Sequence, residues 1–358
     1  MRLLALLASV AASPALAAPA LDQIRLPPGF RISLYSADTP QARSLALGAK
    51  GTLFVGSSGD KVYAIAPGGR ARVIASRLQA PHGVAFRDGA LYVAEIGRIL
   101  RYDGIEERLD HPPKPAVLVD DLPTERHHGL KPIRFGPDGK LYIGIGAPCN
   151  VCEPKEGYGV IQRLDAVAGA KRETYARGVR NSVGFDWDPR TKELWFTDNG
   201  RDMLGDDVPS DELDHAPRAG MNFGFPYCHA GDVSDPQYGG KRPCSAFTPP
   251  AQKLGAHVAS LGMRFYTGER FPQQYRGAIF VAEHGSWNRS TKSGYRVTVV
   301  TLSADGKAQR YEPFAQGWLQ GDSAWGRPVD VIVAPDGALL ISDDSAGAVY
   351  RVDYGTSR

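Results

Sequence analysis

The sequence predicts an all-β fold, a six-bladed β-propeller, from three observations. Glycine and proline are abundant, with 41 and 27 among 358 residues, which favours many turns and few long helices. A hairpin of two short apolar strands around a tight turn occurs six times. Repeats of roughly 40 residues with this pattern are typical of propeller blades.

The clearest hairpin surrounds the turn Gly136-Pro-Asp-Gly139. One strand ends at Phe135 before this turn, and the alternating strand Leu141–Ile145 follows it. Proline fixes φ at the first corner of such a turn, and Gly139 can adopt a positive φ at no steric cost. We therefore expect two antiparallel strands here.

The other five copies share the order strand, turn, strand, with alternating polarity and almost no helical periodicity. They span Ala42–Ile65, His82–Tyr102, Val179–Asp198, Gly277–Val300 and Val329–Val352. A separate first strand is expected after Leu26-Pro-Pro-Gly29. Because an isolated sheet of this size buries too little apolar surface to be stable, we expect one domain over residues 19–358, with long loops around 200–257.

Residues 1–18 have the pattern of a cleaved signal peptide. Arg2 precedes an apolar run from Leu3 to Ala12, and Ala15-x-Ala17 fits the cleavage rule for small residues. This run is too short to span a bilayer, and no other run approaches the roughly 20 apolar residues that a membrane helix needs. We expect a periplasmic or secreted protein that does not span a membrane.

The formal net charge is +3, and no block of basic residues occurs. A nucleic-acid partner is therefore not expected. The chain also lacks a glycine-rich dinucleotide fingerprint and a Gly-x-Ser-x-Gly nucleophile elbow, so neither a nicotinamide cofactor nor serine catalysis is predicted.

Four cysteines are present, and an even count in an exported protein favours disulfides. Of the three possible pairings, we expect Cys149 with Cys152 and Cys228 with Cys244. Glu153, not histidine, follows Cys152, so the attachment motif of c-type haem is absent. A zinc site would need two further soft ligands nearby, and the spacing does not suggest one.

Polar residues stand at the starts of several predicted blades or in the loops beside them. In a propeller these positions converge on one central opening, although they are far apart in sequence. The candidates are His82, His127, His128, Arg180, Asn181, His284, Arg289, Lys292 and Arg327. Each alone fits a surface charge or a turn histidine. Together they would suit an anionic ligand, with a histidine able to take a proton.

The segment Asp198–Asp214 holds seven acidic residues in seventeen positions. Taken alone, it is expected to be a solvated loop. It could also supply oxygen ligands to a hard cation such as Ca²⁺, although its spacing does not match an EF-hand.

Together these motifs resemble the soluble sugar dehydrogenases that depend on pyrroloquinoline quinone (PQQ), most closely their sorbosone and pyranose dehydrogenase branch. The resemblance extends from Leu26 to Val352. It is carried by His128 seven residues before Phe135-Gly-Pro-Asp-Gly139, by Gly178-Val-Arg-Asn181, by Asp198-Asn-Gly-Arg201, by His284-Gly-Ser-Trp-Asn-Arg289 and by Gly326-Arg-Pro-Val-Asp330.

This resemblance implies a six-bladed propeller with PQQ over the central opening, a sugar substrate, and a respiratory electron acceptor such as a cytochrome or quinone. It implies His128 as the catalytic base, with Arg180 assisting. The cofactor-binding residues that it implies are Arg180, Asn181, Arg289, Lys292 and Arg327. The implied Ca²⁺ ligands are backbone carbonyls of Gly200 and Arg201. His82 and His127 are the candidate substrate contacts.

Three positions depart from the glucose-oxidising members of the family. His127 replaces an acid, Ala147 stands where an acid that orients the base is expected, and Val329 replaces an arginine. Glucose specificity is therefore not implied, and the base must be oriented by another group. On an extended segment, the side chain of His127 should point away from that of His128.

Two other functions fit parts of the pattern. A Ca²⁺-dependent lactone or ester hydrolase on a six-bladed propeller would share the acidic segment and the histidine, but would not need the cationic residues. A non-catalytic propeller that binds sugars or protein would tolerate changes at the central histidine and arginines. Uptake of PQQ with Ca²⁺ by the apo-protein, followed by bleaching of an artificial dye with sugars, distinguishes the dehydrogenase from both alternatives.

Overall fold

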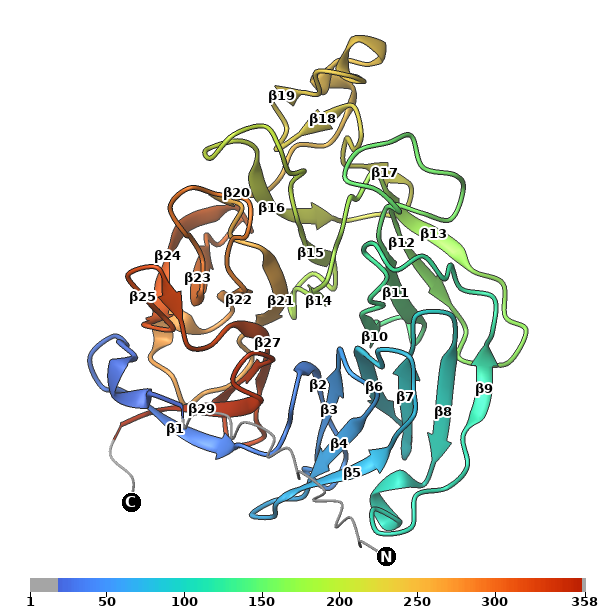
Figure 1. Cartoon of the computed structure of the whole chain (residues 1–358), viewed down its shortest axis with the longest axis vertical. Helices are drawn as coiled ribbons and strands as arrows, with labels where there is room; N and C mark the ends of the chain where they lie inside the picture. Colours follow the sequence, from blue (N-terminus) through green and yellow to red (C-terminus); the bar gives the residue numbers. More distant parts are fainter. Residues whose placement is uncertain (1–18, 356–358) are drawn as a thin grey trace, which may run out of the picture.

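The computed structural model describes residues 19–355, which form a ring of six antiparallel sheets, as predicted (Figure 1). The predicted signal peptide lies outside the described residues. The strands of blades one to three, from the axis outwards, are β2 (Ala42–Leu47), β3 (Leu53–Ser57), β4 (Val62–Ile65) and β5 (Ala71–Ala75); β6 (Gly83–Arg87), β7 (Ala90–Ala94), β8 (Ile99–Asp103) and β9 (Ala116–Val119); and β10 (Ile133–Phe135), β11 (Leu141–Ile145), β12 (Val160–Leu164) and β13 (Glu173–Arg177).

Blades four to six follow the same order. Their strands are β14 (Phe185–Trp187), β15 (Leu194–Asp198), β16 (Ser210–Ala216) and β20 (Gln252–Ala256); β21 (Ser260–Phe265), β22 (Ile279–Glu283), β23 (Arg296–Leu302) and β24 (Ala308–Gln316); and β27 (Pro328–Val333), β28 (Leu339–Asp343), β29 (Ala348–Tyr354) and β1 (Phe30–Ser36).

Short elements fill the connections. The extra strands are β17 (Met221–Asn222), β18 (Cys228–His229), β19 (Val233–Ser234), β25 (Leu319–Gln320) and β26 (Ser323–Ala324). The helical turns are η1 (Leu21–Gln23), η2 (Ile105–Glu107), η3 (Gly239–Lys241), η4 (Cys244–Ala246) and η5 (Gln273–Tyr275). Among the described residues, none of the helices has the length and apolar character needed to cross a membrane.

The predicted hairpin of blade three is present. Phe135 pairs with Leu141 across the turn, and Gly139 adopts a φ of +80°. The amide of Gly139 donates a hydrogen bond to the carbonyl oxygen of Gly136 over 3.0 Å, which closes the turn. The local sequence therefore determines this turn in the way that its residue types predict.

The predicted first strand, β1, closes the ring. It pairs antiparallel with β29, with Phe30 opposite Tyr354, so the two ends of the described chain share blade six (Figure 1). Phe30 also packs edge-to-face on Phe271 and Phe314 of blade five, with ring centroids 4.8 and 5.0 Å apart. Such contacts add about 0.5–1.5 kcal/mol each beyond the burial of apolar area.

The core lies between the blades. Strands such as β3, β7, β11 and β15 are buried at every position, because each sheet packs against a sheet on either side. Six large apolar clusters fill the spaces between neighbouring blades, including the space between blades six and one. The ring thus buries apolar surface that one sheet could not bury alone.

Part of the long insertion predicted around 200–257 is regular structure. It contains β16 and β20, the third and fourth strands of blade four, because the repeat continues across a polar, turn-rich sequence. The remainder forms the lobe with β18 and β19 at the top of Figure 1. Both predicted disulfides are present, Cys149–Cys152 before β12 and Cys228–Cys244 within the lobe.

Candidate active site

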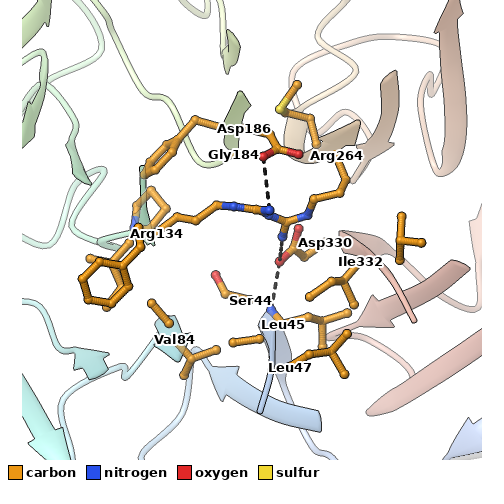
Figure 2. Close-up of a pocket in the computed structure, with 18 of the residues that line it drawn as sticks. Ser44, Leu45, Leu47, Val84, Arg134, Gly184, Asp186, Arg264, Asp330 and Ile332 are labelled. Atoms are coloured by element: carbon orange, nitrogen blue, oxygen red, sulfur yellow. Dashed lines mark hydrogen bonds and ion pairs between the residues drawn. The ribbon is translucent and has the colours of Figure 1, made fainter. Parts of the chain in front are cut away.

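All six inner strands surround an axial cavity of about 410 Å³, shown in Figure 2. Its charged side chains pair with one another. Arg134 contacts Asp186 over 3.1 Å, and Arg264 lies 3.6 Å from Asp330. All four come from inner strands, so this cavity is a polar section of the propeller axis.

The two carboxylates of the axial cavity also connect neighbouring blades. Asp186 of blade four accepts a hydrogen bond from the amide of Phe265 in blade five, over 3.0 Å. Asp330 of blade six accepts one from the amide of Leu45 in blade one, over 2.8 Å. Because these carboxylates already have partners, we assign them a structural role, which is to connect neighbouring blades.

A second cavity, of about 180 Å³, lies where the inner strands begin. Its walls come from loops of blades three, four and five. The lining residues are His128, Arg180, Asn181, Asn199, Gly200, Asp202, Asp211, His257, Ala259 and Trp287. Four of the residues predicted from sequence therefore lie together here: His128, Arg180, Asn181 and Gly200.

His128 sits in a tight turn with a φ of +49°, a conformation that is strained for a residue with a side chain. Space for it depends on Gly146, because a Cβ at that position would lie 2.5 Å from the Cβ of His128. The ring Nδ1 lies 2.8 Å from the carbonyl oxygen of Ala147. Since a carbonyl only accepts, Nδ1 carries the proton and Nε2 is free to accept one.

The environment of His128 keeps its imidazole neutral. Burial, reinforced by the positive charges of Arg180 and His127, lowers the pKa of His128 from 6.5 to about 3. The backbone of Ala147 therefore orients the ring at the position where the glucose-oxidising relatives are expected to have an acid. A neutral, oriented imidazole in a cavity can serve as a general base.

The expected orientation of His127 is wrong. The rings of His127 and His128 lie 4.1 Å apart at an angle of 56°, with His127 exposed. The reason is that residues 126–128 form a turn, so the alternation of an extended segment does not apply.

Arg180 is held from several directions, and its side chain is only 4% exposed. Its Nη1 donates to the carbonyl oxygen of Asn199 over 3.1 Å, and its Nη2 lies 3.1 Å from a carboxylate oxygen of Asp202. Its Nε donates to the carbonyl oxygen of Asn150 over 2.9 Å. The guanidinium is thus fixed in the cavity wall with its charge largely shielded from water.

The expectation that Asp198–Asp214 is a solvated loop is wrong for four of its seven acids, since Asp198, Asp211, Glu212 and Asp214 are buried. Asp198 accepts hydrogen bonds from the amides of Arg180 and Asn181, over 2.7 and 2.6 Å. Burial raises the pKa of Asp198 to about 7 and that of Asp211 to about 6. The backbone of the cavity wall needs acceptors, and Asp198 and Asp211 supply them.

Of the two predicted Ca²⁺ ligands, Gly200 lines the cavity, whereas Arg201 is buried and does not line it. Neither carbonyl oxygen accepts a hydrogen bond from any residue between 19 and 355. The amide of Gly200 is fixed by Asp211 over 3.0 Å. Among residues 19–355, no group of three or more His, Cys, Asp or Glu side chains is placed to hold a metal. A cation here would therefore rely on backbone oxygens, which Ca²⁺ accepts.

The predicted arginines of blades five and six, Arg289 and Arg327, do not line the 180 Å³ cavity. Arg289 donates to the carbonyl oxygen of Asp206 over 2.9 Å and to the carboxylate of Asp207 over 3.0 Å. Arg327 donates to the carbonyl oxygens of His284 and Gly285 over 3.0 and 2.7 Å. These side chains support the loops on this face of the ring, and their cofactor roles stay predictions.

Lys292 is also outside the cavity wall. Its Nζ donates to the carbonyl oxygen of Asp322 over 2.5 Å in an exposed contact. The contact joins the loop after β22 to the turn between β25 and β26, and the side chain of Lys292 is exposed. Its predicted contact with the cofactor stays a prediction.

Two histidines of the predicted ring lie between blades. His82 is 1% exposed, accepts a hydrogen bond from Nε of Arg43 over 3.3 Å, and contacts Ser44 over 3.2 Å. His284 lies 2.8 Å from Asp344, whose carboxylate also pairs with Arg43. The structure thus joins both histidines to a network across blades one, two, five and six. Neither histidine lines the cavity, although the amide of His284 donates to the carbonyl oxygen of the lining residue Ala259 over 2.9 Å, and the substrate role of His82 stays a prediction.

Six lining residues were not predicted as site residues from the sequence: Asn199, Asp202, Asp211, His257, Ala259 and Trp287. Trp287 is 70% exposed although it borders the cavity. His257 contacts the carbonyl oxygen of Gly205 over 2.8 Å. Trp287 stands inside the motif His284–Arg289, which is the signal that could have identified it. Nothing in the spacing of His257 distinguishes it from a loop residue.

Comparison with known proteins gives a family match over nearly the whole described chain. The model of a family described as TrAA12-like matches residues 24–355. An uncharacterized protein of Borreliella burgdorferi is 35% identical over 347 residues, which cover 92% of this chain and 91% of that protein. A PQQ-dependent pyranose dehydrogenase of Coprinopsis cinerea is 32% identical over 122 residues, 29% of this chain and 16% of that protein.

Solved structures agree with the fold. A Trichoderma reesei enzyme of carbohydrate-active family AA12 superposes with a TM-score of 0.82 at 19% identity, covering 96% of this chain and all of that chain, 100%. The holo PQQ domain of the C. cinerea pyranose dehydrogenase gives a TM-score of 0.78 at 20% identity, covering 92% and 97%. The predicted fold and the resemblance to PQQ-dependent sugar dehydrogenases are confirmed, and they indicate an oxidoreductase of sugar-dehydrogenase type.

Proposed function

Because the chain belongs to the TrAA12-like family, we propose that it is a PQQ- and Ca²⁺-dependent dehydrogenase that oxidises a sugar at a hemiacetal or alcohol carbon. The observation that carries the proposal is His128. Its Nδ1–H is bound to the carbonyl oxygen of Ala147, and its neutral Nε2 is free in a cavity that it shares with Arg180.

Residues that line the cavity, together with residues of the loops on the same face of the ring, suit the cofactor. PQQ carries three carboxylates, and Arg180, Asn181, Arg289, Lys292 and Arg327 would hold it. Within residues 19–355, the buried Nε of Arg289 and Nδ2 of Asn288 have no hydrogen-bond partner, so donors remain for an anionic ligand. The free carbonyl oxygens of Gly200 and Arg201 would hold Ca²⁺. When bound, PQQ accepts two electrons and Ca²⁺ polarises its carbonyl groups.

The chain's own residues would manage the proton. Nε2 of His128 takes the proton of the substrate hydroxyl, and the carbonyl oxygen of Ala147 stabilises the charged ring through Nδ1–H. Arg180 contributes positive charge near the developing negative oxygen. The same charge lowers the pKa of His128, so Arg180 stabilises the product of proton transfer and weakens the base at once.

We also propose that the protein acts outside the cytoplasm after removal of residues 1–18, and passes electrons to a respiratory acceptor. The hydrolase alternative has less support. It needs acidic side chains around a cation, whereas the buried Asp198 and Asp211 bind backbone amides.

Titration of purified apo-protein with PQQ tests the proposal. In excess Ca²⁺ we expect saturable binding, followed by reduction of an artificial dye when a pyranose is added. In EDTA we expect much weaker binding. Equal affinity in both conditions would contradict the role of Ca²⁺, and PQQ binding without oxidation of any sugar would contradict the dehydrogenase.

A further inference from the structure

The loop closed by the Cys149–Cys152 disulfide borders the candidate active site. Asn150 stands inside this small ring and uses three of its polar atoms in four hydrogen bonds. Its carbonyl oxygen accepts from Nε of Arg180 and its Oδ1 accepts from Nη2 of Arg180, both over 2.9 Å. Its Oδ1 also accepts from the amide of Asp202 over 2.9 Å, and its Nδ2 donates to the carbonyl oxygen of Asp202 over 3.1 Å.

Both partners of Asn150 line the cavity, and both belong to blade four, whereas Asn150 follows β11 of blade three. Asn150 therefore fixes the guanidinium of Arg180 at two points. It also fixes both the amide and the carbonyl of Asp202, next to the carbonyl of Arg201. Loss of its side chain would leave Arg180 with fewer restraints and remove the two hydrogen bonds that hold the backbone of Asp202.

The disulfide matters because one of these acceptors is the backbone of Asn150. A carbonyl oxygen keeps its direction only if the backbone is fixed, and residues 148–152 belong to no strand or helix. The same loop also reaches the base. The amide of Ala147 donates to the carbonyl oxygen of Arg180 over 2.8 Å, and its carbonyl accepts from His128.

We propose that Asn150 is a positioning residue whose backbone is fixed by the Cys149–Cys152 disulfide, and that it orients Arg180 and Asp202 for PQQ binding. This inference rests on the proposed function. It predicts that reduction of the disulfide weakens cofactor binding. A dithiol would break the S–S bond by supplying two electrons and two protons. The products are two cysteine thiols and the disulfide of the reagent.

Two variants of Asn150 test the positioning role in the full-length protein. In Asn150→Ala, affinity for PQQ in excess Ca²⁺ falls about tenfold, as expected when a charged group loses a buried hydrogen bond. In Asn150→Asp, which keeps the Oδ1 acceptor for Arg180 but loses the Nδ2 donor to the carbonyl oxygen of Asp202, part of that affinity is recovered. Binding is measured by quenching of protein fluorescence, without substrate. Wild-type affinity in Asn150→Ala, or a greater loss in Asn150→Asp than in Asn150→Ala, would overturn the inference.

Hydrogen exchange in the apo-protein separates this inference from the proposed function. Asn150→Ala should speed exchange of the amides in residues 199–203, whether or not PQQ is the cofactor. Unchanged exchange there would overturn the positioning role. If the wild type binds no PQQ but exchange is faster in the variant, the proposed function fails and the contact through Asn150 stands.

The second disulfide provides a matched control. Cys228 and Cys244 make no hydrogen bond to Arg180 or Asp202 among the described contacts. The double variant Cys149→Ser, Cys152→Ser should lose PQQ affinity about as Asn150→Ala does. The double variant Cys228→Ser, Cys244→Ser should melt at a lower temperature with PQQ affinity unchanged. Equal PQQ affinity in the two double variants would overturn the role of the Cys149–Cys152 disulfide.

Discussion

The two cavities contain similar side chains but use them differently. In the 410 Å³ cavity, Arg134 pairs with Asp186 and Arg264 lies beside Asp330, so the charges have partners within the protein. In the 180 Å³ cavity, Nε2 of His128 is free to accept a proton, although it borders a buried arginine. The smaller cavity is therefore the better candidate, because unsatisfied hydrogen-bonding groups indicate ligand binding more directly than volume does.

The two cavities have one feature in common: buried carboxylates beside them connect neighbouring blades. Asp330 receives the amide of Leu45 beside the larger cavity, and Asp211 receives the amide of Ser260 over 2.8 Å beside the smaller one. Asp330 thereby joins the inner strands of blades six and one, and Asp211 joins the third strand of blade four, β16, to the inner strand of blade five, β21. Buried carboxylates thus connect neighbouring blades beside both cavities, whereas we expect catalysis only in the smaller one.

The largest expected effect is on kcat, and it distinguishes the two cavities directly. His128→Ala should lower kcat for sugar oxidation by about 10²–10⁴-fold with PQQ still bound, because a general base is lost. The matched variant Arg134→Ala removes a charge from the larger cavity and should leave kcat within a fewfold of the wild type. Single-turnover reduction of bound PQQ measures both. Comparable losses in the two variants would show that both cavities contribute to catalysis.

The sequence is sufficient to predict the hairpins, the ring and the position of the active-site histidine and arginine, because these depend on local patterns. The turn Gly136–Gly139 specifies a hairpin, six such hairpins specify the ring, and the positions before the inner strands place His128 and Arg180 on one face. The pairing of Asp330 with Leu45 could not be predicted, because it joins blades at the two ends of the chain. The burial of Asp211 could not be predicted either, since an acid in a polar segment usually lies in solvent.

The next effect concerns stability. Asp330→Ala should destabilise the fold by about 3 kcal/mol, because Arg264 loses its carboxylate and the amides of Leu45 and Val331 lose their acceptor. Affinity for PQQ should not change. Urea unfolding and PQQ titration of the same preparation check both statements. A loss of PQQ affinity without a loss of stability would indicate that the larger cavity binds the ligand.

A smaller effect is expected in the pH dependence of stability. Burial raises the pKa of Asp330 from 3.8 to about 7. Between these values the folded protein binds the proton that the unfolded chain has lost. The contribution of Asp330 to the free energy of unfolding is therefore fully present below about pH 4 and falls as the pH rises towards 7. Asp330→Asn removes the titration, so the unfolding free energy of the wild type should fall relative to that of Asp330→Asn over this range. Parallel profiles would contradict the raised pKa.

The smallest expected effect is at the active site. His127→Ala should change kcat by less than about tenfold, because the ring of His127 is exposed and His128 keeps its bond to Ala147. Its charge contributes to lowering the pKa of His128, so removing it should raise that pKa slightly. As pH falls from neutral, the ¹⁵N shifts of His128 should then begin to change at a higher pH in the variant. The opposite direction would mean that the protonated His127 does not act on His128. A loss of single-turnover reduction in His127→Ala, with normal reduction in His128→Ala, would reassign the base to His127, and the free Nε2 would then have another role.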